Sequence, residues 1–74
     1  MTRSQQIAQN EVRKARSWLD SCRTMRDAAE ARLRAGADYP ERYRLRSDVD
    51  AAVVRCKVAY DDWRGWERLA RTIR

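Results

Sequence analysis

Histidine is absent from this chain of 74 residues, and only two cysteines, two glycines and one proline are present. Without histidine, no serine or cysteine nucleophile has its usual activating base. Two cysteines cannot complete a tetrahedral zinc site within one chain. The chain also lacks a glycine-rich phosphate loop. We therefore expect no enzymatic activity, no catalytic residue, no metal, no cofactor and no small-molecule substrate.

Long hydrophobic runs are absent as well. No run approaches the roughly 18–20 residues that a membrane span needs, and the polar start leads into no apolar signal segment. We expect a cytoplasmic protein, or one in the host cytoplasm if the source is viral, with no membrane contact.

Large aliphatic side chains are few. Val, Ile, Leu and Met together number thirteen, whereas alanine alone accounts for eleven residues. A chain this short and this poor in large hydrophobic side chains is marginal as an isolated fold. The composition favours a module that is completed by self-association or by a larger protein.

One break divides the chain. Gly36 suits the left-handed position after a helix, and Pro40 suits the first turn of the next one. No segment alternates with the period of a strand. We predict a single domain, 1–74, with a helix over about 3–35, a turn over about 36–40 and a helix over about 41–72.

Two capping boxes are predicted, one at the start of each helix. Thr2 is followed by Gln5, and Asp38 is followed by Glu41, each at the three-residue spacing of this motif. In such a box the first side chain accepts a hydrogen bond from a free backbone N–H of the first helical turn. Both helices are therefore expected to begin with a side-chain cap.

Both helical segments carry a seam of mostly apolar residues with alternating spacings of three and four, which is the pattern of a coiled coil. If the chain folds back at Tyr39, facing seam residues have numbers that sum to 78, and small residues then oppose larger ones. The predicted fold is all-α, a two-helix antiparallel coiled-coil hairpin. Its seam is Ala8, Val12, Ala15, Leu19, Cys22, Arg26, Ala29 and Leu33 against Leu45, Val49, Ala52, Cys56, Ala59, Trp63, Trp66, Ala70 and Ile73.

Two features of the seam have alternative interpretations. Cys22 and Cys56 share a layer, so they form either an interhelical disulfide or two small buried thiols that stay reduced in the cytosol. Arg26 interrupts the seam opposite Ala52. It either fixes the register or oligomeric state, with Asp48 as its counter-charge, or extends outward and contacts a partner.

Several apolar residues lie outside the seam and are candidates for a protein interface. Trp18, Met25 and Leu69 form one flank of the predicted hairpin, and Val54, Val58 and Gly65 lie on the back of the second helix. Gly65 is either an approach point for another helix or a harmless outward position. The partner is a second copy, in a dimer or four-helix bundle, or a different protein.

The positive charge offers an alternative function. Fifteen arginines contribute to a net charge of +6, and such a charge attracts nucleic acid by counterion release. The candidate phosphate contacts are Arg13, Arg64, Arg68, Arg71 and Arg74. Our first hypothesis remains a non-enzymatic protein-interaction module, of a kind that suits a phage or bacterial accessory protein, and the alternative is a basic hairpin that binds nucleic acid.

Overall fold

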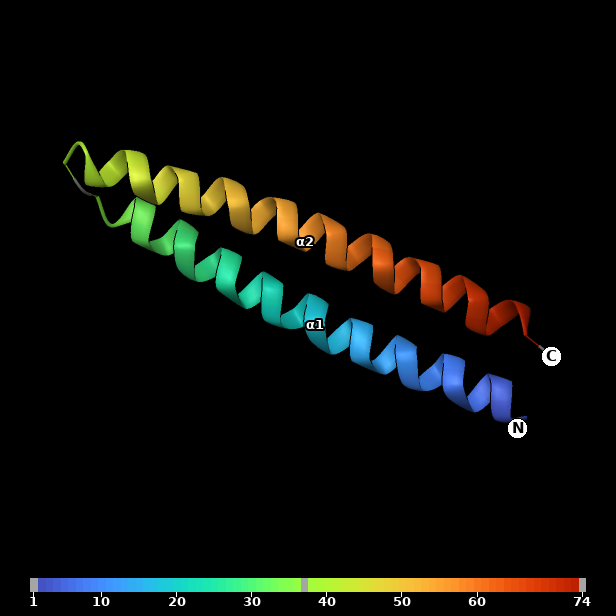
Figure 1. Ribbon diagram of the computed structural model, residues 1–74. Coiled ribbons are helices and arrows are strands. Elements are labelled where there is room, and N and C mark those ends of the chain that lie inside the picture. Colours follow the sequence, from blue (N-terminus) through green and yellow to red (C-terminus); the bar gives the residue numbers. More distant parts are fainter. Residues whose placement is uncertain (1, 37, 74) are drawn as a thin grey trace.

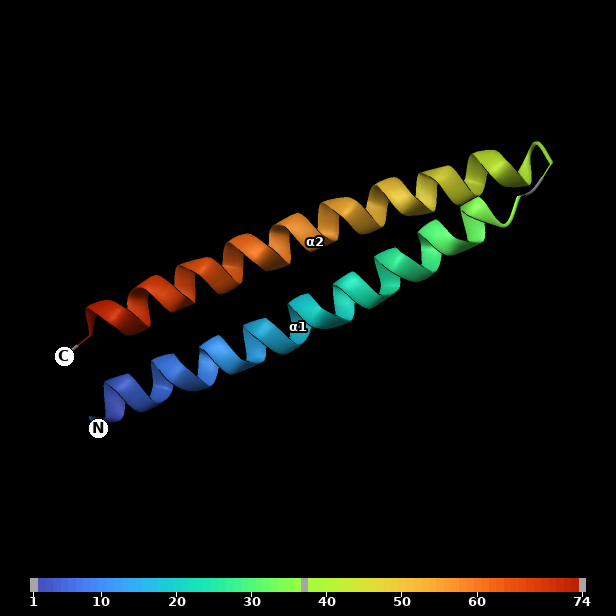
Figure 2. The same cartoon turned by 180° about the vertical axis from the view of Figure 1, so that it is seen from behind.

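The computed structural model describes residues 2–36 and 38–73, and these form two long helices. α1 spans Arg3–Arg34 and α2 spans Glu41–Thr72. They run side by side in opposite directions, with both chain ends at one end of the molecule (Figure 1 and Figure 2). No strand occurs in the described part of the chain. The predicted all-α antiparallel hairpin is confirmed. The predicted turn includes Ala37, which lies outside the described residues.

The start of α1 has the predicted capping box. The Thr2 hydroxyl oxygen accepts a hydrogen bond from the Gln5 backbone N–H at 3.2 Å, and the Thr2 backbone N–H donates to Gln5 Oε1 at 2.9 Å. These bonds satisfy backbone donors that a helix start otherwise leaves free. The Gln5 side-chain amide also donates to the Ile73 carbonyl at 3.3 Å, so the same residue links the two helices at the open end.

The turn differs from the prediction at one point. Gly36 has a φ of 88°, the left-handed conformation expected after α1. The predicted cap of α2 by the Asp38 side chain is wrong, because Pro40 occupies the N-cap position and no side chain bonds there. Asp38 lies two residues too early for its carboxylate to reach the first turn. Its backbone carbonyl instead accepts from the Arg42 N–H at 3.1 Å.

The core is a single narrow seam made mainly of small side chains. Every residue classed as buried lies at a predicted seam position, and the other predicted seam residues are half-buried. Among the residues that the structure describes, Leu19 is the only large side chain that is fully buried, and it lies in a cluster with Cys22, Cys56, Ala59 and the partly buried Trp63. The buried residues are Ala8, Ala15, Leu19, Cys22, Ala29, Ala52, Cys56 and Ala59.

The hairpin is far from compact. Its Cα atoms extend over 56 × 13 × 12 Å, with a radius of gyration of 16.8 Å. A globular chain of this length has a radius of gyration of about 11 Å. Each helix has 32 residues and is therefore about 48 Å long. Since one helix contacts only one other, most of each helix circumference faces outward.

Truncation of the one large core side chain tests this description. We expect Leu19→Ala to lower the free energy of unfolding by about 3 kcal/mol, because it leaves a cavity between two helices that cannot easily close. Leu33→Ala removes the same atoms at a half-buried seam position and should cost about half as much. Chemical denaturation followed by circular dichroism measures both. Equal losses would show that Leu19 is not at the centre of the core.

The conformation of Gly36 gives a second test. Gly36→Ala should lower the free energy of unfolding by about 1 kcal/mol, because an alanine side chain is strained at positive φ. Gly36→Asn should cost less, since asparagine tolerates this conformation. Thermal unfolding of the three proteins at one concentration provides the comparison. An alanine variant as stable as the parent would contradict the observed turn.

Candidate protein interface

The hairpin has two flanks, and the register shows which residues share each one. Met25, Ala28 and Arg32 from α1 line a shallow hollow together with Asp48 and Arg55 from α2. On this flank, facing residues of the two helices have numbers that sum to 80, as Met25 and Arg55 do. Trp18 lies one heptad before Met25, in the same row of α1, and Leu69 lies two heptads after Arg55, in the same row of α2.

We call this side the apolar flank and define it by Trp18, Met25, Val58, Gly65 and Leu69. The four side chains are partly open to solvent, with exposed fractions of 43% for Trp18, 55% for Met25, 54% for Val58 and 44% for Leu69. Side chains of this size and apolar character are unusual in such a row on a free surface. The structure therefore brings together five of the six residues predicted for a protein interface.

Gly65 lies beside a second hollow on the same flank, which is also lined by Asp61, Asp62, Trp66 and Leu69. A Cβ atom built at Gly65 meets no other atom within 4 Å. The glycine is therefore not needed for packing within one hairpin, although it costs about 1 kcal/mol relative to alanine inside a helix. The surface beside Gly65 is therefore open in a single hairpin.

Val54, the sixth predicted interface residue, does not belong to the apolar flank. It is 62% exposed and lies on the outer side of α2, in the same heptad row as Asp61 and Arg68. Conversely, Ile7 was not predicted as an interface residue, but it is exposed and lies three heptads before Ala28 on the apolar flank. The heptad position of Ile7 would have assigned it to this flank, although no other large apolar residue of the flank lies near the start of α1.

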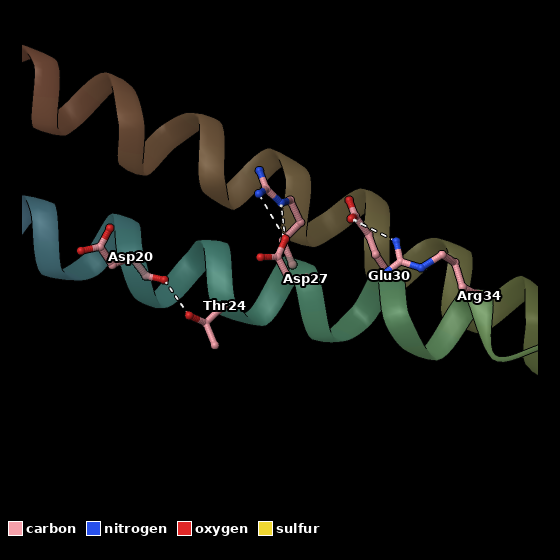
Figure 3. A network of polar contacts seen from close by, with 6 residues as sticks. Asp20, Thr24, Asp27, Glu30 and Arg34 are labelled. Atoms are coloured by element: carbon pink, nitrogen blue, oxygen red, sulfur yellow. Dashed lines mark hydrogen bonds and ion pairs between the residues drawn. The ribbon is translucent and has the colours of Figure 1, made fainter.

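The opposite side is rich in charged residues that pair with one another, and we call it the charged flank. Figure 3 shows part of it on α1, where Asp20, Asp27, Glu30 and Arg34 line up. Its ion pairs in α1 are Arg16–Asp20 at 3.3 Å, Arg26–Asp27 at 3.2 Å and Glu30–Arg34 at 4.0 Å. Among the described residues every ion pair lies within one helix. Such exposed pairs contribute little to stability.

One cationic contact does cross between the helices on this flank. The Arg16 guanidinium lies over the Trp63 ring, 5.1 Å from its centroid, and Tyr60 packs against the same ring at 5.8 Å. Cation–π contacts of this kind are worth about 0.5–1 kcal/mol where they are exposed. Contacts within the chain therefore occupy part of the charged flank, although Val53 and Tyr60 on this side are 47% and 42% exposed.

Arg26 extends outward instead of pairing with Asp48, so the predicted counter-charge is wrong. Its Nε and Nη2 atoms donate to one oxygen of Asp27, at 3.3 and 3.2 Å. This hydrogen bond raises the pKa of the Arg26 guanidinium above its ordinary value. Asp27 is the neighbouring residue, whereas Asp48 lies on the apolar flank, away from the direction that the Arg26 side chain takes. Arg26 therefore leaves the seam through its flexible stem.

The arginines considered for nucleic acid are partly engaged within the chain. Arg64 and Arg71 both donate to Glu67 Oε1, at 3.0 and 2.9 Å. Arg13 donates to the Asn10 side chain at 2.6 Å. Arg68 is exposed. Arg74, the last of the predicted phosphate contacts, lies outside the described residues.

The two cysteines share a core layer, as the register predicted. Cys22 and Cys56 are both buried, belong to the same cluster and are free thiols. Within the described residues, no group of three or more histidine, cysteine, aspartate or glutamate side chains could hold a metal ion. Neither α1 nor α2 contains an apolar stretch that could cross a membrane.

No family model, curated protein or solved structure matches this chain.

The state of the cysteines can be tested by thiol labelling. We expect both cysteines to react with a maleimide in denaturant without prior reduction, because each is a free thiol. In the folded protein labelling should be slow, since the two residues are only 6% and 7% exposed. The helices must separate locally before the reagent can reach the thiols. Mass spectrometry counts the added groups. Labelling in denaturant that requires prior reduction would establish the alternative interhelical disulfide.

Proposed function

We propose that this protein is a non-enzymatic protein-interaction module that binds another helical surface through its apolar flank. The observation that carries the proposal is the difference between the two flanks. Trp18, Met25 and Leu69 stand exposed on one side of the hairpin, whereas the other side carries ion pairs along α1 and the Arg16–Trp63 contact between the helices. Exposed aromatic and large aliphatic side chains that gather on one side of a protein are typical of protein contact sites.

The small core supports the same function. Over residues 2–36 and 38–73 only one large side chain is fully buried, and the hydrophobic effect scales with the apolar area that is removed from water. A second helical surface packed on the apolar flank would bury part of four further apolar side chains. The hairpin would then gain stability from the contact that performs its function.

Nucleic-acid binding is the second hypothesis, and the net charge of +6 favours it. The arrangement of the arginines favours it less, because Arg64 and Arg71 share one carboxylate. A protein contact on the apolar flank should tolerate salt, whereas phosphate contacts weaken steeply as salt rises. In either role we place the protein in the cytoplasm, as an accessory protein of a bacterium or phage.

Site-specific photo-crosslinking in the cells that produce the protein tests the first hypothesis. A photoreactive residue is placed at Met25, on the apolar flank, or at Arg23, two residues earlier on the charged flank. We expect discrete protein adducts from position 25 and few from position 23, because contact with a partner requires the apolar side.

Two outcomes would overturn the proposal. Equal adducts from both positions would indicate that neither flank is a specific contact surface. Adducts with nucleic acid from position 23, without protein adducts from position 25, would establish the alternative function.

A further inference from the structure

We infer that the partner of the apolar flank is a second copy of this chain, packed face to face about a two-fold axis as a four-helix assembly. This inference rests on the proposed function and names its partner. In such a contact the same surface is used by both molecules. The surface must therefore be large enough, electrically compatible with itself and shaped to accept its own side chains.

The exposed area meets the first requirement. The chain exposes 5815 Å², whereas a globular monomer of 8.8 kDa exposes about 4,800 Å². The excess of about 1,000 Å² is close to the roughly 800 Å² that each partner contributes to a standard stable interface. Burial of one flank would thus bring the exposed area per chain to that of an ordinary globular protein.

The charge of the apolar flank meets the second requirement. Although the chain carries +6, the apolar flank is neutral, because its acidic and basic residues are equal in number. The Glu41–Arg44 ion pair near the turn leaves this balance unchanged. Two copies can approach through this side without net repulsion, while the surplus positive charge stays outside the contact. The charged residues of the flank are Glu11, Asp48 and Asp62 against Lys14, Arg32 and Arg55.

Most of these charges are also available for pairing. Lys14 and Glu11 form an ion pair at 3.4 Å. Among the described residues no ion pair within the chain involves Arg32, Arg55, Asp48 or Asp62. Two cations and two anions that lack ion-pair partners on one surface suit a second copy of that surface, because the second copy offers charges of both signs for pairing. Complementary charges of this kind fix the register of a contact.

The shape of the flank meets the third requirement. Ala29 and Ala52 form part of the hollow beside Met25, and Gly65 borders the other hollow. Both hollows are bordered by small residues that lack side chains to fill them. The protruding side chains of the same flank, such as Trp18 and Leu69, are of the size that fills such hollows when helices interdigitate.

The solution mass of the full chain tests this inference. Light scattering or analytical ultracentrifugation of the purified protein, with reductant, should give twice the mass of one chain at micromolar concentrations. The mass should persist in high salt, because the contact is apolar at its centre. A monomeric mass at every concentration would overturn the inference.

Two valines on α2 provide a matched pair of variants. Val58→Lys places a charge in the contact and should weaken dimerisation at least about tenfold. Val54→Lys makes the same change four residues earlier, on the outer side of α2, and should leave the dimer intact. If Val54→Lys dissociates the dimer and Val58→Lys does not, the chain associates through a different surface.

The Gly65→Gln variant distinguishes a loss of dimerisation from a loss of folding. Glutamine has a higher helix propensity than glycine, and the space beside Gly65 is open in one hairpin, so the variant hairpin should be at least as helical as the parent. In the dimer the longer side chain occupies the hollow, and dimerisation should weaken about tenfold. A Gly65→Gln dimer as tight as the parent would contradict the predicted contact.

The mass and crosslinking experiments separate the two proposals. A monomeric chain that nevertheless crosslinks from position 25 to a different protein would overturn the inference that the partner is a second copy. The proposal that the protein is an interaction module would remain supported. A chain with neither a dimeric mass nor adducts from position 25 would overturn both.

Discussion

The contact between the two helices along a seam of small residues determines most of the other properties of this protein. Five of the eight buried residues are alanine and two are cysteine, so the helices are held together by little apolar area at each layer. Stability must then come from the length of the contact, because hydrophobic stabilisation scales with buried area. The long and thin shape follows directly. In such a hairpin most of the surface of each helix is not covered by the other helix. The function of the protein then depends on what this surface binds.

The two flanks of this surface differ in the contacts that their side chains make. On the charged flank, ion pairs within each helix and the Arg16–Trp63 contact engage many of the side chains with their own chain. On the apolar flank, Trp18, Met25 and Leu69 find no such engagement, and unpaired charges of both signs lie between them. We therefore propose the apolar flank, and not the charged flank, as the side that binds another helical surface. This asymmetry allows one small hairpin to have a specific contact side.

The positions of the helices and of the seam could be predicted because they depend on local spacing. The three-and-four pattern, Gly36 and the Thr2 capping box each act within a few residues, and all three appear in the structure. The cap at Asp38 failed because a proline two residues later took the cap position. The pairing of Arg26 failed because a long side chain can reach several carboxylates, and the neighbouring Asp27 was closer than any across the hairpin. The residues that lie on each flank could be predicted from their heptad positions. The hollows beside Met25 and Gly65, and the engagement of Arg64 and Arg71 by Glu67, depend on side-chain positions that the heptad does not specify.

We propose that contact with a second surface adds to the stability of the hairpin, because the seam of one hairpin buries mainly small side chains. The dependence of the melting temperature on protein concentration tests this most directly, because association stabilises the folded state by mass action. Circular dichroism melts of the purified chain should show a melting temperature that rises steadily as the concentration is increased. A melting temperature that stays constant across the same range would contradict the claim, since the hairpin would then be stable alone.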